Sequence, residues 1–486
     1  MKKLKIAGGA AAALLLILVV NTLRVGRAPQ APPATDLVAV DKDAAVERLA
    51  GAVRIATVSY SDRSQIDGGK LDQLAAHLQK SFPRVHAELK REVVNGHSLL
   101  FTWQGSDAAA RPMLTLAHQD VVPIEPGSES AWQHPPFSGD VAGGYLWGRG
   151  ALDDKSSLVA QLEATELLLA QGFKPRRTVY FAFGHDEEIG GEEGAAKVAE
   201  LLAARGVKAE FSLDEGGSMT RGVVPGIERP VATIATGEKG YASFRLTAHD
   251  AGGHSSRPPA VTAIGRLSRA VALIEANQLP ERLSPPVADM LDRLAPEYGF
   301  LRRLAVANRW LLAPLIAHSL THDRLTNALV RTTTAPTVFH AGIKDNVLPR
   351  EAYAIVNFRI LPGDSIESVE QHIRRVIDDP EIQLATEAFA SEPSPVSDPG
   401  APGFVLLERT VNEVFPDALV ATGLVIGATD NRHYGAVRDN RYNFVPDVLT
   451  DEDIKTVHGV NERVAVDSYV RMVQFYARFL KAAAGS

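Results

Sequence analysis

The stretch that decides the fold of this chain is Phe183–Gly191, FGHDEEIGG, in which two adjacent glutamates, Glu187 and Glu188, follow a strand-like apolar run. The run before it, 178–183, reads TVYFAF, and its β-branched and aromatic residues are typical of a buried parallel strand. Gly184 interrupts this run, so we expect the glutamates in the loop at the carboxyl end of the strand. In open α/β sheets that edge binds the ligand.

Two further apolar runs end in the same kind of side chain. The run 114–117 is followed by His118, and the run 211–213 is followed by Asp214 and Glu215. A lone pair of glutamates is most often solvated surface, because Glu is seldom buried without a partner. Three strand-like runs that are each followed by a His or a carboxylate at the same sheet edge indicate a ligand-binding or catalytic site instead.

Length and composition indicate a soluble globular protein of more than one domain. The chain has 486 residues, of which 45% are hydrophobic and 22% are charged, and this rules out a disordered chain. The formal net charge of −7, without a long basic run, argues against a nucleic-acid partner. Because the sequence contains no cysteine, disulfides are excluded, and any metal must be held by His and carboxylate side chains.

Residues 1–35 differ from the rest and read as an export segment followed by a linker. Three lysines precede the apolar run Ile6–Val20, and a Pro/Ala-rich stretch continues to Ala34. The run is shorter than the roughly 20 residues of a spanning helix, which favours a cleavable signal peptide, although Leu23 could extend it into an uncleaved anchor. We therefore expect a periplasmic, extracellular or membrane-tethered protein whose globular part begins near Asp36.

A glycine-rich segment, Leu146–Lys155 or LWGRGALDDK, contains another carboxylate candidate. Gly148 and Gly150 permit a tight backbone, and Asp153 or Asp154 lies where the N-cap of a following apolar helix belongs. Read alone, Asp153 could be only that cap. Near the end of the chain, His458 precedes another amphipathic helix pattern and, taken singly, could be structural.

Taken together, the candidate ligands are His118, Asp153, Glu188, an acid at 214 or 215, and His458. Two imidazoles and three carboxylates suit two divalent ions such as zinc, bridged by one carboxylate.

The same residues belong to a set of motifs whose order and spacing resemble the di-zinc aminoacylase and carboxypeptidase family. The motifs are His118–Asp120, Gly148–Asp153, Asp186–Gly191, Asp214–Gly216, Gly253–Ser256, Gly427–Arg432 and His458–Glu462. The resemblance covers about residues 40 to 482, and within the family it is greatest to carboxypeptidase S, a Gly-Xaa carboxypeptidase, and to the N-fatty-acyl-amino-acid synthase/hydrolases.

The resemblance implies two zinc ions per chain. It makes Asp153 the bridging ligand, places His118 and the acid at 214 or 215 on one ion, and places Glu188 and His458 on the other. Both Asp214 and Glu215 are available for the first ion, and the pattern Leu213-Asp-Glu favours Glu215.

Two further carboxylates have implied roles beside the ligands. Glu187 becomes the general base that collects the proton of the attacking water and passes it to the leaving amine. Asp120 is placed to accept the second ring N–H of His118 and to fix its tautomer.

The middle of the chain, 237–392, reads as a separate α+β domain inserted between the catalytic parts 36–236 and 393–486. The segment 240–248 alternates apolar and polar residues, which is typical of a half-exposed antiparallel strand. Further strands are expected at 337–341 and 353–361 and a helix at 365–377. The predicted architecture is α/β, with a mixed-sheet catalytic domain and a ferredoxin-like lid or dimerisation domain.

Several residues are candidates for substrate recognition through the resemblance. Arg359, on the polar face of its strand, and Asn346 resemble the pair that binds a substrate carboxylate, for which a planar guanidinium is suited. The alternative is an ordinary solvated arginine, and Arg432 is then the next candidate. His254 resembles the lid histidine that stabilises the oxyanion, in some members in the partner subunit's site, so we expect a homodimer.

The lid also contains an extra segment, 279–331, which is helical by pattern and includes Trp310–Ile316. We expect packing or an oligomer contact there, or else an apolar wall for an acyl chain or a membrane contact.

The predicted function is a zinc-dependent carboxypeptidase of the Gly-Xaa type that acts on small peptides. The alternative is a hydrolase of N-acyl amino acids. The alternative that is not an enzyme is an exported binding protein without catalytic activity. The presence of Glu187 argues against it, because a binding protein has no need of a general base that is not a metal ligand.

Overall fold

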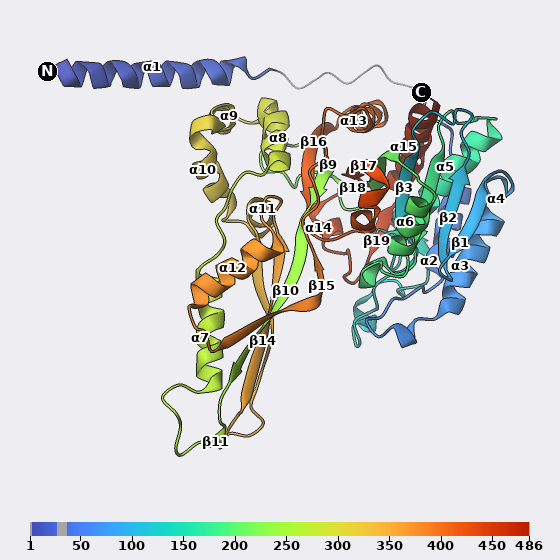
Figure 1. Ribbon diagram of the computed structural model, residues 1–486. Helices are drawn as coiled ribbons and strands as arrows, with labels where there is room; N and C mark the ends of the chain where they lie inside the picture. The colour runs from blue at the N-terminus through green and yellow to red at the C-terminus, as the bar shows by residue number, and fades with distance from the viewer. Residues whose placement is uncertain (1, 27–35, 486) are drawn as a thin grey trace. The chain divides into compact units, whose positions relative to one another are not determined.

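The structure is a computed structural model that describes residues 2–26 and 36–485 (Figure 1). The linker expected up to Ala34 lies outside these residues. The contacts divide the chain into two compact units. The lid unit comprises residues 1–26, 237–396 and 424–428, and the large unit comprises 27–236, 397–423 and 429–486.

The large unit is built on a mixed sheet with parallel strands at its centre. The strand order is β1-β2-β6-β3-β7-β17-β9-β8-β18, and β16 (Leu419–Val425) also pairs with β9. The bounds are β1 Lys90–Val94, β2 Ser98–Trp103, β3 Met113–His118, β6 Val179–Gly184, β7 Ala209–Asp214, β8 Met219–Thr220, β9 Val231–Glu238, β17 Arg438–Asn443 and β18 Val448–Leu449. The predicted mixed sheet is confirmed.

Helices cover both faces of this sheet, which explains the nearly continuous apolar runs of its central strands. Phe181 and Phe183 of β6 pack into one core, whereas Ala182 between them packs into the other. The first core includes α2 Lys42–Val53, α3 Gly68–Ser81, α4 Pro83–Glu88, α5 Lys155–Ala170, α13 Pro402–Val414 and α15 Val466–Gly485. The second includes α6 Ala195–Ala204 and the 3-10 helix η5 Asp430–Ala436.

The carboxyl ends of three parallel strands meet at one edge of the sheet. His118 at the end of β3 lies opposite Gly184 at the end of β6, and Thr115 of β3 lies opposite Leu213 of β7. The edge predicted from the three apolar runs is therefore confirmed.

A second, small sheet joins two segments that are far apart in the sequence. Its strands are β4 Asp140–Ala142, β5 Tyr145–Trp147 and β19 Arg463–Ala465, in the order β19-β5-β4. Trp147 of β5 lies opposite Arg463 of β19. The segment that follows Trp147 is thereby brought next to the segment that precedes Arg463.

The lid unit has the ferredoxin-like arrangement that the sequence predicts. Its chain order is β10 (Gly240–His249), α7 (Ala263–Ala276), β12 (Thr333–Ala341), β14 (Glu351–Ile360), α12 (Ile366–Ile377) and β15 (Ile382–Ser391). The strands form an antiparallel sheet in the order β12-β14-β10-β15, and α7 and α12 share one core with it. Along β14, Val356, Phe358 and Ile360 are buried in that core, whereas Asn357 and Arg359 are partly exposed on the other face.

The extra segment of the lid is helical, as its pattern predicts. Between α7 and β12 lie α8 (Pro285–Leu294), α9 (Phe300–Ala307), α10 (Arg309–Leu320) and α11 (Arg324–Val330). The N-terminal helix α1 (Lys2–Arg24) belongs to the same unit and packs against α9. Among the residues that the structure describes, no helix has the length and apolar character needed to cross a membrane.

A buried lysine fastens α11 to the sheet of the lid unit. Lys239 lies between β9 and β10, is 2% exposed, and donates to the carbonyl oxygens of Ala328 (2.9 Å) and Arg331 (2.8 Å). Burial, helped by the charge of Arg359, lowers the pKa of Lys239 to about 7. A neutral amine has two N–H groups, which suits these two acceptors.

The stability of the lid unit should therefore rise with pH above neutrality. In the unfolded chain a lysine keeps its proton up to about pH 10.4, so between about pH 7 and that value the unfolded state binds more protons than the folded state. Thermal unfolding at pH 7.5 and pH 9.5 measures this gain, and Lys239→Met should reduce it. An equal gain in the variant would show that other groups cause it.

Candidate metal centre

His118 ends β3 with its imidazole almost completely buried. Its Nδ1 lies 2.9 Å from the backbone oxygen of Asp120 and 3.4 Å from the Asp120 carboxylate, and its Nε2 lies 2.9 Å from Asp153 Oδ1. The Asp120 carboxylate also accepts the backbone N–H groups of Glu187 (3.1 Å) and Glu188 (3.2 Å). Asp120 thus holds the Nδ1 side of the ring and leaves Nε2 directed at the other candidates.

Asp153 lies between two imidazoles. One carboxylate oxygen faces His118, and the other lies 2.9 Å from Nε2 of His458. His458 follows α14 (Asp451–Ile454) with φ = 59°, a left-handed conformation that turns the loop back toward Asp153. Asp154, not Asp153, occupies the N-cap position of α5. The two oxygens of Asp153 are therefore placed as a bridging ligand requires.

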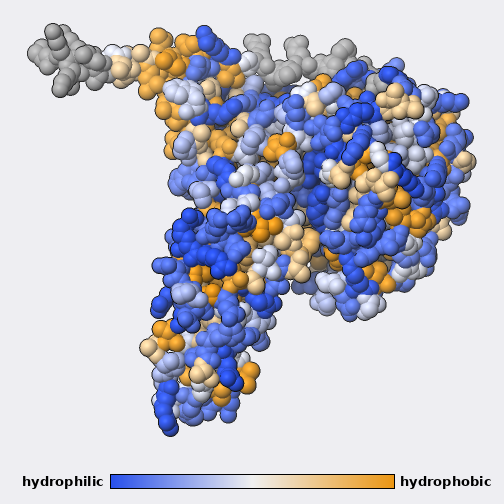
Figure 2. Space-filling view, in the orientation of Figure 1, coloured by the Kyte–Doolittle hydropathy of each residue, from blue (hydrophilic) through white to orange (hydrophobic). Residues whose placement is uncertain are grey.

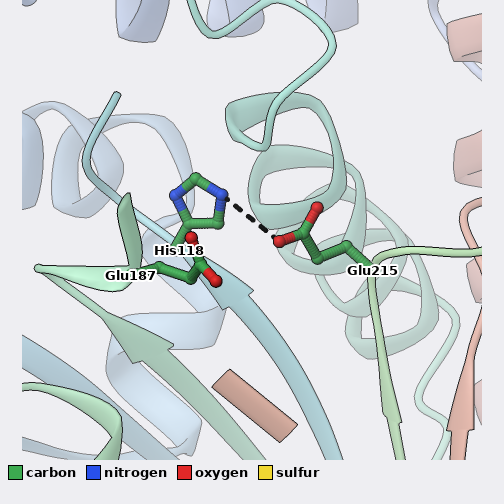
Figure 3. A group of neighbouring side chains, drawn as sticks. All are labelled: His118, Glu187 and Glu215. Atoms are coloured by element: carbon green, nitrogen blue, oxygen red, sulfur yellow. Dashed lines mark ion pairs between the residues drawn. The ribbon is translucent and has the colours of Figure 1, made fainter. Parts of the chain in front are cut away.

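The remaining carboxylates come from the loops after β6 and β7. Glu187 and Glu188 begin the 3-10 helix η3 (Glu187–Ile189), and Glu188 Oε2 lies 3.2 Å from His458 Nε2. Glu215 Oε1 lies 3.6 Å from His118 Nε2 (Figure 3). One potential ligand atom from each of His118, Glu187 and Glu215 lies within 4.8 Å of the other two, and the same holds for His118, Asp153 and Glu188.

The pKa values of these groups show strong mutual coupling. Burial alone would lower the pKa of His118, but its hydrogen bonds to Asp120 and Asp153 raise it well above the usual range. The hydrogen bonds that His458 donates to the Asp153 and Glu188 carboxylates raise its pKa to about 10. Enclosure away from water raises the pKa of Glu187 and of Glu215, and neighbouring carboxylates raise both further. The cluster carries more negative charge than its two imidazoles balance.

These residues fit divalent cations. Glu188 Oε1 is buried and has no hydrogen-bond partner among the described residues, so it is an acceptor available to an ion. Two imidazole nitrogens with several carboxylates form the hard N/O donor set that zinc accepts. The raised pKa values of Glu187 and Glu215 favour bound protons, and a divalent cation among the carboxylates would take the place of those protons.

The alternative ligand Asp214 has a different environment. It ends β7 and accepts the backbone N–H of Asn431 at 2.8 Å. Of the two neighbouring acids, Glu215 is therefore the one that the structure brings to His118. Arg432 donates to the backbone oxygen of Gly190 (2.6 Å) and to that of Thr429 (3.3 Å), so it joins η5 to the η3 loop.

Two residues that the sequence analysis did not single out bind the backbone next to the candidate ligands Asp153 and His458. Glu462 is fully buried and pairs with Arg149. One Glu462 oxygen accepts the backbone N–H groups of Gly150 (2.9 Å), Leu152 (2.9 Å) and Asp153 (3.2 Å). Arg149 also donates to the backbone oxygen of His458 at 3.0 Å. Both residues lie inside motifs already singled out, and their charge at positions flanking the ligands was the available signal.

Asp186 has a comparable structural role in the η3 loop. It is fully buried and accepts the backbone N–H groups of Glu193 (3.0 Å) and Gly194 (2.8 Å), and Arg63 lies 2.9 Å from it. These contacts fix the loop that carries Glu187 and Glu188.

The lid candidates lie at two different places in their unit. His254, in β11 (Gly253–His254), pairs with Val347 of β13 (Val347–Leu348), and the next residue, Ser255, donates its N–H to the backbone oxygen of Asn346 (3.2 Å). Arg359 lies near the far end of β14, with its guanidinium 4.7 Å from the ring centre of Tyr241. At 3.3 Å per residue, the strand from Glu351 to Arg359 alone spans about 26 Å.

The expectation that Asn346 and Arg359 recognise one substrate carboxylate stays a prediction, and this separation limits how a single chain could meet it. The distance exceeds the combined reach of the two side chains, so they cannot bind the same carboxylate from the same chain. Their spacing in the sequence concealed the separation, because an extended strand lies between them.

Comparisons with known proteins agree with this fold. Residues 114–482 match the model of peptidase family M20/M25/M40. The chain is 42% identical to an N-fatty-acyl-amino acid synthase/hydrolase of Xenopus tropicalis, over 92% of this chain and 87% of that one. It is 33% identical to carboxypeptidase S of Saccharomyces cerevisiae, over 90% of this chain and 84% of that one.

Solved structures show the same fold at low sequence identity. A metallo-carboxypeptidase of the M20 family from Sulfolobus solfataricus superposes with a TM-score of 0.66 at 18% identity, over 90% of this chain and 98% of that one. A dinuclear metal-binding M20 peptidase of Bacillus subtilis superposes with a TM-score of 0.56 at 14% identity, over 91% and 99%. The chain belongs to peptidase family M20/M25/M40 and is a hydrolase with the metallopeptidase fold of that family.

Proposed function

We propose that the protein is a two-zinc hydrolase that cleaves the amide bond next to a C-terminal amino acid, as a Gly-Xaa carboxypeptidase does. The observation that carries the proposal is Asp153, whose two oxygens face His118 and His458 while Glu187 lies beside the same cluster. A bridging carboxylate with an adjacent unliganded acid is the donor arrangement that metal-assisted amide hydrolysis needs.

Each residue then has a defined role. His118 and Glu215 would hold one ion, Glu188 and His458 the other, and Asp153 both. When bound, the ions would lower the pKa of a water and offset negative charge that develops on the scissile carbonyl. Glu187 would take the proton of the attacking water on its carboxylate and deliver it to the leaving nitrogen. Asp120 keeps His118 oriented.

Active protein should contain about two zinc ions per chain, because the donor set exceeds what one tetrahedral site takes. Metal analysis of purified protein measures the content, and dialysis against a chelator should abolish activity until zinc is restored. Fully active protein with one ion or none would contradict the two-ion proposal.

An N-acyl amino acid hydrolase is the second candidate, and the 42% identity to a synthase/hydrolase of this type favours it. Both activities release an amino acid with a free carboxylate and differ in the acyl group that precedes it. A panel of dipeptides and N-acyl amino acids of rising chain length separates them by kcat/KM. Hydrolysis of neither class would overturn the proposed function.

Recognition of the free carboxylate is assigned to Arg359. The ring of Tyr241 supports its guanidinium, and it lies on the partly exposed face of β14. Amidation of the substrate carboxylate, or Arg359→Ala, should each lower kcat/KM about ten- to a hundred-and-fiftyfold, because each removes the same charge-assisted contact. The two changes together should cost little more than one.

A matched control for this test lies on the same face of the lid sheet. Arg245 stacks on Tyr353 at 4.3 Å and is paired with Glu387 at 2.8 Å. Arg245→Ala should leave the discrimination between acid and amide unchanged. If Arg359→Ala instead lowers activity equally on both substrates, Arg359 is a structural residue of the lid.

We further propose that the protein acts as an exported homodimer. The separation of Asn346 and His254 from Arg359 supports assigning these two residues to the site of a second copy. Sedimentation equilibrium tests the dimer. Export, as a released or membrane-tethered protein, rests on the residue pattern of 1–35, and protease accessibility of a C-terminal tag on intact cells tests it.

A further inference from the structure

The lid unit has an apolar surface that plays no part in the chemistry above. Exposed apolar residues of α1, α9 and α10 form it, and Figure 2 shows hydrophobic residues gathered along α1 and the helices beside it. Its most exposed members are Leu15, Leu16 and Leu23 of α1, Leu301 of α9, and Trp310 and Leu315 of α10. Single exposed apolar residues are ordinary, but a gathering on three neighbouring helices marks an interaction site.

Helix α1 is a packed part of this unit. Asn308, which separates α9 from α10, is fully buried; its side chain donates to the backbone oxygen of Leu18 (3.0 Å) and accepts from Asn21 (2.9 Å). Thr22 is 2% exposed. Residues 9–17 of the same helix, by contrast, are all exposed. The part of α1 around Leu18–Thr22 is therefore anchored at the junction of α9 and α10, and the apolar residues before it stay exposed.

The three helices that form this surface carry charge of one sign only. The chain as a whole has 58 acidic and 51 basic residues, yet α1, α9 and α10 contain no Asp or Glu. Arg24 and Arg302 are exposed basic residues of these helices. The carboxylates of the adjacent helix α8 are in ion pairs: Asp289 with Arg293 at 2.6 Å, and Asp292 with Arg309. A bare apolar face with a basic rim complements a layer of apolar chains beneath anionic headgroups.

We propose that, in the chain that retains α1, the surface formed by α1, α9 and α10 docks the lid unit onto an anionic lipid bilayer. Leu301 and Leu315 enter the boundary between headgroups and acyl chains, and Trp310 lies at headgroup level, where an indole satisfies both environments. Arginine side chains at the rim contact the phosphates. The proposal is independent of the substrate assigned above, since it uses none of the metal-centre residues.

The tryptophans of the chain provide a direct test. Of its four tryptophans, Trp103, Trp132 and Trp147 are at most 8% exposed, whereas Trp310 is 62% exposed. A change of emission on mixing the full-length chain with vesicles therefore reports Trp310. Vesicles of phosphatidylcholine with phosphatidylglycerol should shift the emission to shorter wavelength, and lipids brominated on the acyl chain should quench it. Trp310→Phe should remove both effects.

Variants in α9 and α10 test whether these helices contribute to membrane binding or whether α1 binds alone. Leu301→Glu with Leu315→Glu should weaken vesicle partitioning about tenfold or more, because each places a charge in the boundary layer. Val405→Glu, at an exposed apolar position of α13, is the matched control and should have no effect. Vesicle-bound protein with unchanged Trp310 emission would overturn the proposal, as would absence of binding. Concentration-dependent shielding of Trp310 without vesicles would assign the surface to a second copy instead.

Discussion

Glu187→Gln should lower kcat by about a hundredfold to ten-thousandfold while the metal content stays unchanged. Glutamine keeps the size of the side chain but cannot carry the proton from the attacking water to the leaving nitrogen. Its backbone N–H still donates to Asp120, so the η3 loop should keep its shape. Steady-state kinetics and metal analysis of the same preparation measure both quantities.

The neighbouring residue distinguishes a proton carrier from a ligand. Glu188 has one oxygen 3.2 Å from His458 and the other without a described partner, so Glu188→Gln should lose metal as well as activity. Glu192→Gln, an exposed change a few positions along the same loop, is the control and should alter neither. Equal metal loss in the Glu187 and Glu188 variants would refute the assignment of their different roles.

Glu462→Gln should destabilise the large unit by about 3–5 kcal/mol, the usual cost of removing one partner of a buried ion pair. The amide oxygen can still accept the three backbone N–H groups, but Arg149, which is 2% exposed, is left with an uncompensated charge. Urea unfolding followed by far-UV circular dichroism measures the change. Metal affinity should fall as well, since one of those N–H groups belongs to Asp153.

An exposed ion pair provides the comparison for Glu462. Lys455 and Asp451 of the α14 region are 2.6 Å apart, with side chains 67% and 69% exposed. Lys455→Met should leave the unfolding midpoint unchanged, because solvent screens such a pair. If Glu462→Gln behaves like this control, the Arg149 pair does not support the centre.

The sequence was sufficient wherever a local pattern determines a position. Buried parallel strands read as apolar runs, so the edge bearing His118 and the loops after β6 and β7 could be located from the residue pattern alone. The ferredoxin-like lid followed from alternation along strands such as β14. Element boundaries shifted by a few residues, since caps and strand ends depend on their surroundings.

Tertiary contacts decided what the sequence could not. Glu462 accepts the N–H of Asp153 because β19 pairs with β5. Nothing in the sequence of either strand indicates that the two strands pair. Asn346 and Arg359 show the reverse effect: residues close in the sequence lie far apart in one chain, because an extended strand separates them. The different surroundings of Asp214 and Glu215 likewise depend on Asn431, whose N–H donates to Asp214.

The β19–β5 pairing also sets an order of events during biosynthesis. A ribosome that has completed His118, Asp153, Glu187, Glu188 and Glu215 has still to add His458, and the sheet that positions the His458 loop forms only after Ala465. A nascent chain therefore carries the carboxylates of the centre without its second imidazole or the strand that holds it. The complete set of candidate ligands is therefore present only when nearly all of the sequence has been translated.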